Sequence, residues 1–169
     1  MMKHILTISL LTAALLCSCN NGGYHIRGTV TDPSLEGAIV FLVPVTEPVH
    51  LPEKDNLDST FIKNGHFEFK GTKERMVDVR IEKFKRMNVQ NLLVVTEPGD
   101  IDVVIGQISS GGGTPQNDSL QSWKNITENR GQLGLQPEDY IERTRSMAHS
   151  IGDNSTLGSF LLSLYPEKK

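Results

Sequence analysis

Cysteine is nearly absent from this chain of 169 residues, and its two cysteines, Cys17 and Cys19, stand together near the amino terminus. Disulfide frameworks, Cys-x-x-Cys redox pairs and thiolate metal sites all need cysteines in the folded part of a protein. If cleavage falls between Ser18 and Cys19, the mature chain keeps one sulfur, which a lipid then caps. The sequence therefore excludes thiol redox chemistry in the mature protein.

Long apolar runs and a strong net charge are also missing. The longest mainly apolar run, Ile5–Leu16, has 12 residues, whereas a membrane-spanning helix needs about 20. The net charge is −3, and it becomes −4 when residues 1–18 and their single lysine are removed. Such mild acidity gives no electrostatic reason to expect nucleic acid as a partner. The remaining length suits one folded domain.

The first 19 residues have the three zones of an export signal, namely a short polar start with Lys3, an apolar run and a closing motif. The closing Leu16-Cys17-Ser18-Cys19 resembles the bacterial lipobox, in which Leu lies three residues before the lipid-carrying Cys and a small residue precedes that Cys. We therefore expect residues 1–18 to be a signal peptide, Cys19 to be lipidated, and residues 19–23 to form a flexible tether. An ordinary cleaved signal with a coincidental cysteine is the alternative.

Lipidation at Cys19 predicts where the protein resides. Two or three acyl chains hold a protein at a bilayer far more firmly than one chain does. The expected location is the bacterial cell envelope, at the outer membrane rather than the inner one, on the periplasmic or surface side. The bilayer itself, reached through the N-terminal lipid, is then the first expected partner.

Residues 24–108 have the pattern of β-strands. Polar and apolar residues alternate over 24–31 and 76–82, which is typical of half-buried strands. The run Ala38–Val43 is apolar on both faces, as in a strand covered on two sides. Residues 44–58 contain three prolines and predict a long loop or an irregular edge.

Two turn motifs join the predicted strands. Asn64-Gly65 suits the two positive-φ positions of a type I′ turn and predicts a hairpin between 59–63 and 66–70. Pro98-Gly99 suits a type II turn between 92–96 and 101–105. About seven short strands with turns between them predict a mainly β, α+β fold built on an antiparallel β-sandwich or open barrel.

Residues 109–169 change character. The stretch Ser109–Gly113 (SSGGG) predicts a hinge-like linker, and Thr114-Pro115 then offers a helix start. Trp123 lies at the spacing of an apolar helix face and is expected to anchor the core. The predicted extension packs on the same domain, and its two or three helices cover residues 115–131, 137–151 and 155–165.

Titratable side chains do not form a recognisable metal, cofactor or catalytic motif. His25 and His66 fall on outward strand faces and are expected to be solvated, while Asp100 and Asp102, like Asp55 and Asp58, are interpreted as turn acids. The basic run Lys83, Lys85 and Arg86 around Phe84 is interpreted as a solvated hairpin tip. An unrecognised periplasmic hydrolase using Asp100, Asp102 or His66, or a ligand-binding protein, stays as the alternative to a non-catalytic protein.

Three motifs, taken in their order and spacing, resemble one family. They are Asp58-Ser59-Thr60 followed by Asn64-Gly65-x-Phe67-x-Phe69-x-Gly71, then Glu97-Pro98-Gly99-Asp100-Ile101-x-Val103, and then Gly113-Thr114-Pro115-x-Asn117-Asp118. The resemblance, to domain of unknown function 4369, covers residues 24–164. In many periplasmic lipoproteins this domain precedes a thioredoxin-like thiol-disulfide oxidoreductase domain. The resemblance implies a β-sandwich with a helical extension.

The chain departs from such proteins after its last predicted helix, because no Cys-x-x-Cys domain follows before Lys169. We expect either a free-standing accessory domain or a fragment separated from its catalytic half. The leading hypothesis is a non-catalytic interaction or scaffold module, with a thioredoxin-like oxidoreductase of the envelope as a partner. Two triplets, Asp58-Ser59-Thr60 and Asp118-Ser119-Leu120, also resemble a short bacterial O-glycosylation signal.

Overall fold

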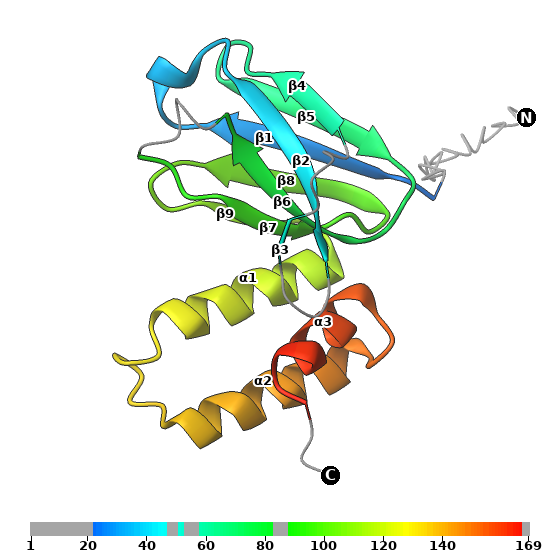
Figure 1. Ribbon diagram of the computed structural model, residues 1–169, viewed down its shortest axis with the longest axis vertical. Helices are drawn as coiled ribbons and strands as arrows, with labels where there is room; N and C mark the ends of the chain where they lie inside the picture. The colour runs from blue at the N-terminus through cyan, green and yellow to red at the C-terminus, as the bar shows by residue number, and fades with distance from the viewer. Residues whose placement is uncertain (1–21, 47–50, 53–57, 83–87, 167–169) are drawn as a thin grey trace, which may run out of the picture.

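The computed structural model describes residues 22–46, 51–52, 58–82 and 88–166. Within them, nine strands form two packed sheets, and three helices follow at the C-terminal end (Figure 1). The predicted β-sandwich with a helical extension is confirmed. The expected signal peptide, residues 1–18, and Cys19 lie outside the described residues.

The strands divide into two sheets. Sheet 1 has the spatial order β5 (His66–Gly71), β1 (Tyr24–Val30), β8 (Gly99–Ile105) and β9 (Ser110–Gly112). Sheet 2 has the order β3 (Leu51–Pro52), β2 (Ile39–Thr46), β6 (Met76–Ile81) and β7 (Leu92–Val95), and β4 (Asp58–Phe61) also pairs with β2. The pairing is antiparallel as predicted, with one exception, since β1 and β8 run parallel.

The core lies between the two sheets, where the predicted alternation of polar and apolar residues along the strands places it. Apolar residues of β1, β5 and β8 face those of β2, β6 and β7, including Ile26, Phe69, Ile101, Leu42, Val77 and Val94. Gly28 is part of this packing, because a Cβ there would stand 2.1 Å from the Phe67 ring. The Phe67 ring therefore fills the space that a side chain at position 28 would occupy.

The Asn64-Gly65 turn is confirmed, with φ of 53° and 73°, but the predicted hairpin is wrong beyond one bridge, Lys63 with His66. The strand before the turn, β4, joins sheet 2, and the strand after it, β5, joins sheet 1. The predicted type II turn is also wrong. Gly99 has φ of 134° and pairs with Tyr24, because the chain crosses there from sheet 2 to sheet 1. Turn residues alone do not reveal which layer each flanking strand joins.

The SSGGG stretch is a strand and not the predicted hinge. Ser110–Gly112 form β9, which pairs with Asp102–Val104 of β8. Its glycines permit close approach, since a Cβ on Gly113 would lie 2.7 Å from the Asp100 carbonyl oxygen. The loop predicted for residues 44–58 is likewise shorter than expected, because β2 continues through Pro44 to Thr46.

The helices begin and end close to the predicted signals. They are α1 (Pro115–Glu128), α2 (Pro137–Ile151) and α3 (Thr156–Leu164). Gly152, with φ of 107°, ends α2, and the Ser155 hydroxyl caps α3 by accepting a bond from the Gly158 amide. Among the described residues no helix is both long and apolar enough to span a membrane.

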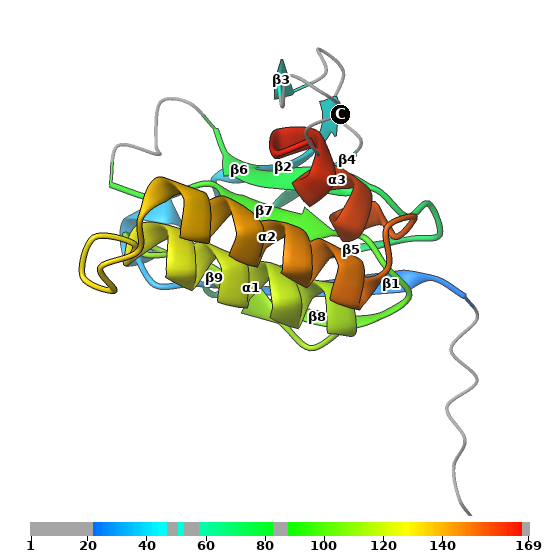
Figure 2. The ribbon, with the colours of Figure 1, turned by 90° about the horizontal axis from the view of Figure 1, so that it is seen from below.

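The helices pack below the sandwich in the view of Figure 1, and α1 and α2 lie side by side in both views (Figure 1, Figure 2). A second apolar cluster joins Leu120, Ala148, Leu157 and Phe160 to Met76 and Val95 of sheet 2. Trp123 packs at the edge of this cluster, against the Phe160 ring at 6.3 Å between centroids. Trp123 is thus half-buried at the helix–sheet junction and does not lie between the sheets.

Candidate functional site

Helix α1 closes the side of the sandwich where β7 and β9 are edge strands. The Asn117 side chain is 2% exposed and binds Val95 of β7 as a neighbouring strand would. Its Oδ1 accepts from the Val95 amide at 2.9 Å, and its Nδ2 donates to the Val95 carbonyl at 2.8 Å. On the same helix face, Gln121 accepts from the Gly111 amide of β9 at 3.0 Å. One helix therefore satisfies backbone groups on the edges of both sheets.

The start of α1 is held by a buried carboxylate. Glu97 is 7% exposed, and its Oε1 accepts from the amides of Gln116 at 2.7 Å and Asn117 at 3.1 Å. A carboxylate at the positive end of a helix is favourable. Thr114 precedes the helix without capping it, because its hydroxyl accepts from Asn117 Nδ2 instead. The Glu-Pro and Thr-Pro-x-Asn motifs of the sequence therefore dock α1 on the sandwich.

Lys124 lies further along the same helix, over sheet 2, and sequence reasoning missed it. Its Nζ donates to the Leu93 carbonyl of β7 at 3.4 Å. Burial lowers the pKa of Lys124 to about 8, against the opposing effect of the Glu128 and Asp78 charges. Lys124 lies four residues after the buried Leu120, on the same face of α1, and only the tertiary structure places that face against a strand.

The outer face of sheet 1 carries a group of mainly polar side chains from three strands, here called the charged face. Its members are His25, Arg27 and Thr29 of β1, His66, Glu68 and Lys70 of β5, and Asp100, Asp102 and Val104 of β8. All of them are exposed except His25, which is partly covered. The predicted outward position of His25 and His66 is confirmed, whereas Asp100 and Asp102 are strand residues and not turn acids.

Ion pairs connect the charged face across its strands. The Arg27 guanidinium donates twice to the Asp102 carboxylate, at 2.8 and 3.0 Å, and this bond raises the pKa of Arg27 further. The His25 ring lies between two carboxylates, with Nε2 at 3.2 Å from Glu68 and Nδ1 at 3.3 Å from Asp100. Lys70 extends the network, with Nζ at 3.7 Å from Glu68. The charges are thus arranged by the pairing of neighbouring strands.

Two hydrolase candidates, His66 and Asp102, share one open depression on the charged face. The depression has a volume of about 380 Å³ and is also lined by Arg27, Thr29 and Val104. The two side chains do not pair, because both Asp102 oxygens bind Arg27 and His66 Nδ1 lies 3.4 Å from the Thr29 hydroxyl. Asp100 lies outside this depression, beside His25. No three acidic, histidine or cysteine side chains among the described residues are arranged for a metal ion.

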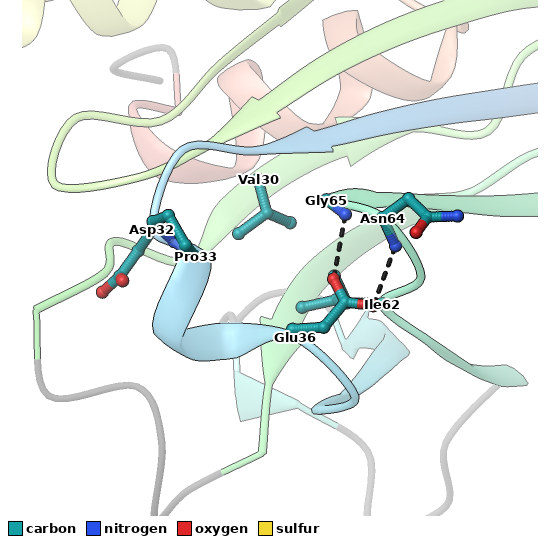
Figure 3. Close-up of a pocket in the computed structure, with 7 residues that line it drawn as sticks. All are labelled: Val30, Asp32, Pro33, Glu36, Ile62, Asn64 and Gly65. Carbon is teal, nitrogen blue, oxygen red and sulfur yellow. Dashed lines mark hydrogen bonds between the residues drawn. The ribbon is translucent and has the colours of Figure 1, made fainter.

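A second depression, also of about 380 Å³, lies at the Asn64-Gly65 turn (Figure 3). Here Glu36 accepts from the Asn64 amide at 2.8 Å and from the Gly65 amide at 3.0 Å. Paired amides of a turn can bind an anion, and the chain supplies its own carboxylate. Glu36 follows the short 3₁₀ helix η1 (Pro33–Leu35), so this arrangement fixes the β1–β2 connection. Only the fold brings residue 36 to residues 64 and 65.

The remaining candidates are placed as follows. The basic run of residues 83–86 and Asp55 lie outside the described residues. Ser59 of the first glycosylation triplet is exposed on β4. Ser119 of the second triplet is half-buried in α1, and its hydroxyl donates to the Pro115 carbonyl at 2.9 Å. The two triplets are therefore unequal in accessibility.

A family model described as Domain of unknown function (DUF4369) matches residues 24–120, more than half of the chain. The chain belongs to the DUF4369 family. No curated protein and no solved structure matches it. The DUF4369 match starts with β1 and ends inside α1, three residues after Asn117. It thus includes both sheets, Glu97, and Asn117 of α1, which binds Val95 of β7.

Proposed function

We propose that this DUF4369 protein is a lipid-anchored, non-catalytic module of the bacterial cell envelope that binds a partner protein through the charged face. The lipobox-like motif at Cys19 supports the anchor. The observation that carries the binding role is the ion-pair network that joins Lys70, Glu68, His25, Asp100, Arg27 and Asp102 over three strands.

The network suits recognition because its charges are held by a sheet. Side chains paired on adjacent strands lose little conformational freedom on binding, and a mixed charge pattern favours a partner with the complementary pattern. The edges of β7 and β9 are engaged by α1, so a partner binds the face and not these edges. The family context suggests a thioredoxin-like oxidoreductase of the envelope as that partner, with the DUF4369 protein acting as its accessory.

The experiment compares partners captured by chemical crosslinking in intact cells. The test variant exchanges a charge pair, Arg27→Asp with Asp102→Arg, which keeps an ion pair but reverses its direction on the charged face. The control, Lys63→Glu, changes an exposed charge at the Asn64-Gly65 turn. We expect the exchange to reduce recovery of the partner at least tenfold and the control to leave it unchanged. Equal recovery from both variants would refute binding through the charged face.

A ligand-binding or hydrolytic role is the second candidate, and the depression shared by His66 and Asp102 favours it. His66→Ala tests this role, with ester, peptide and glycan substrates supplied to the purified protein. A loss of turnover of tenfold or more on this substitution would support the hydrolase. Turnover that is absent, or unaffected by the change, would count against it.

A further inference from the structure

The last residue of the predicted tether, Gly23, is already held by the sandwich. Its carbonyl accepts from the Gly99 amide at 3.1 Å, and a Cβ on Gly23 would lie 2.6 Å from the Gly71 carbonyl oxygen. The chain between the proposed lipid, which is on Cys19, and the anchored Gly23 therefore consists of residues 19–22. Four extended residues span about 14 Å at most. One end of the sandwich is consequently confined to a short distance from the bilayer.

The connection from β5 to β6, residues 72–75, lies at this end of the sandwich, because it directly follows Gly71. It presents two basic residues, Lys73 and Arg75. Lys73 is exposed, and Arg75 is partly exposed. Among the described residues no ion pair joins either of them to a carboxylate. Lys73 and Arg75 are the two basic residues between Gly71 and Met76.

Four acidic side chains nearby are engaged by the fold, and one of them, Asp58, lies near Tyr24 together with Arg75 and accepts from the Ser59 amide at 2.7 Å. Glu74 accepts from Gln116 Nε2 and from the Thr156 hydroxyl, both at 2.8 Å. Glu97 is occupied by the start of α1, and Asp100 by His25. Arg75, in contrast, has a buried Nε atom without any hydrogen-bond partner. Because this atom is buried, a lipid phosphate cannot reach it, and only the exposed part of Arg75 is available to bind one.

We propose that Lys73 and Arg75 form a membrane-facing rim that binds the phosphate groups of anionic lipids in the bilayer to which Cys19 is attached. This inference rests on the proposed lipid anchor. The rim would orient the sandwich with residues 72–75 toward the lipid, and the Asn64-Gly65 turn, at the other end of β5, away from it. The charged face then stands beside the bilayer, open to an envelope partner.

The test uses the lipoprotein isolated from its native membrane and reconstituted in two kinds of vesicle, phosphatidylcholine alone and phosphatidylcholine with phosphatidylglycerol. Because Cys19 carries the lipid, single cysteines introduced by Thr72→Cys or Lys63→Cys accept a fluorescent label without competition. Spin-labelled lipid quenches a label that lies at the headgroups. We expect strong quenching at position 72 and weak quenching at position 63, with the contrast greater in the anionic vesicles.

Charge variants in the Thr72→Cys background test the rim itself. Each basic side chain near an anionic surface changes the ratio of docked to undocked protein by roughly fivefold. Lys73→Gln should lower that ratio about fivefold and Lys73→Glu about 30-fold, and 0.5 M salt should lower it as well. Lys63→Glu, the same reversal at the far end, should leave it unchanged. Circular dichroism checks that each variant is folded.

The outcomes separate this inference from the proposed function. Intact mass first shows whether Cys19 carries acyl chains. Acylated protein with equal quenching at positions 63 and 72, or with no response to Lys73→Glu, overturns the rim and leaves the anchor standing. Protein without acyl chains that stays off the vesicles overturns both.

Discussion

The substitution Asn117→Ala is the strongest test of how α1 binds the edge of β7. The change removes the amide that binds both backbone groups of Val95 and the Thr114 hydroxyl. It leaves the Val95 amide and carbonyl buried, and each unsatisfied group costs about 1 to 3 kcal/mol. We therefore expect a loss of about 2 to 6 kcal/mol, a large part of the 5 to 15 kcal/mol that typically separates folded from unfolded protein.

The assay is urea unfolding at 25 °C, followed by the fluorescence of Trp123, the only tryptophan, and by circular dichroism. Trp123 reports on helix docking because it packs against Phe160 at the helix–sheet junction. Ser122→Ala, at an exposed position of the same helix, is the control and should change stability by less than about 0.5 kcal/mol. A loss below about 1 kcal/mol for Asn117→Ala would show that α1 does not serve as an edge strand.

Three further predictions concern Lys124, Cys19 and the two glycosylation triplets. Because burial holds the pKa of Lys124 at about 8, below its unfolded value near 10.5, charged Lys124 destabilises the fold, and this cost disappears as the pH rises from 8 to 10.5. Urea unfolding at pH 7 and pH 10 should show wild type gaining up to about 3 kcal/mol relative to Lys124→Met, and parallel pH profiles would contradict the burial argument. Cys19→Ser should abolish processing and membrane association, and a variant of mature size in the membrane fraction would disprove lipidation. If the native protein carries an O-glycan, Ser59→Ala should remove it and Ser119→Ala should not, as read by intact mass, because only Ser59 is exposed; glycan loss from the Ser119 variant would contradict this assignment.

Local signals in the sequence determined most of the secondary structure, although not β9 or the end of β2. Alternation predicted the buried sides of β1, β5 and β8, because successive side chains of a strand point to opposite faces. Prolines at the start of α1 and α2, Ser155 before α3 and Gly152 after α2 predicted helix ends, because capping depends on only a few adjacent residues. The two positive φ angles of Asn64-Gly65 were predictable for the same reason.

Tertiary structure decided which strands pair and what the motif residues do. The strands on either side of the Asn64-Gly65 and Pro98-Gly99 segments join different sheets, and that choice depends on the whole core and not on turn residues. Asp100 and His25, or Asp102 and Arg27, are far apart in the chain and meet only through the parallel pairing of β1 with β8. Lys124 acquires its low pKa only by packing on β7. Contacts between distant residues decide which strands pair, which side chains are buried and which charges meet. The sequence by itself specified most of the elements. Their packing created the charged face and the edge contacts of α1.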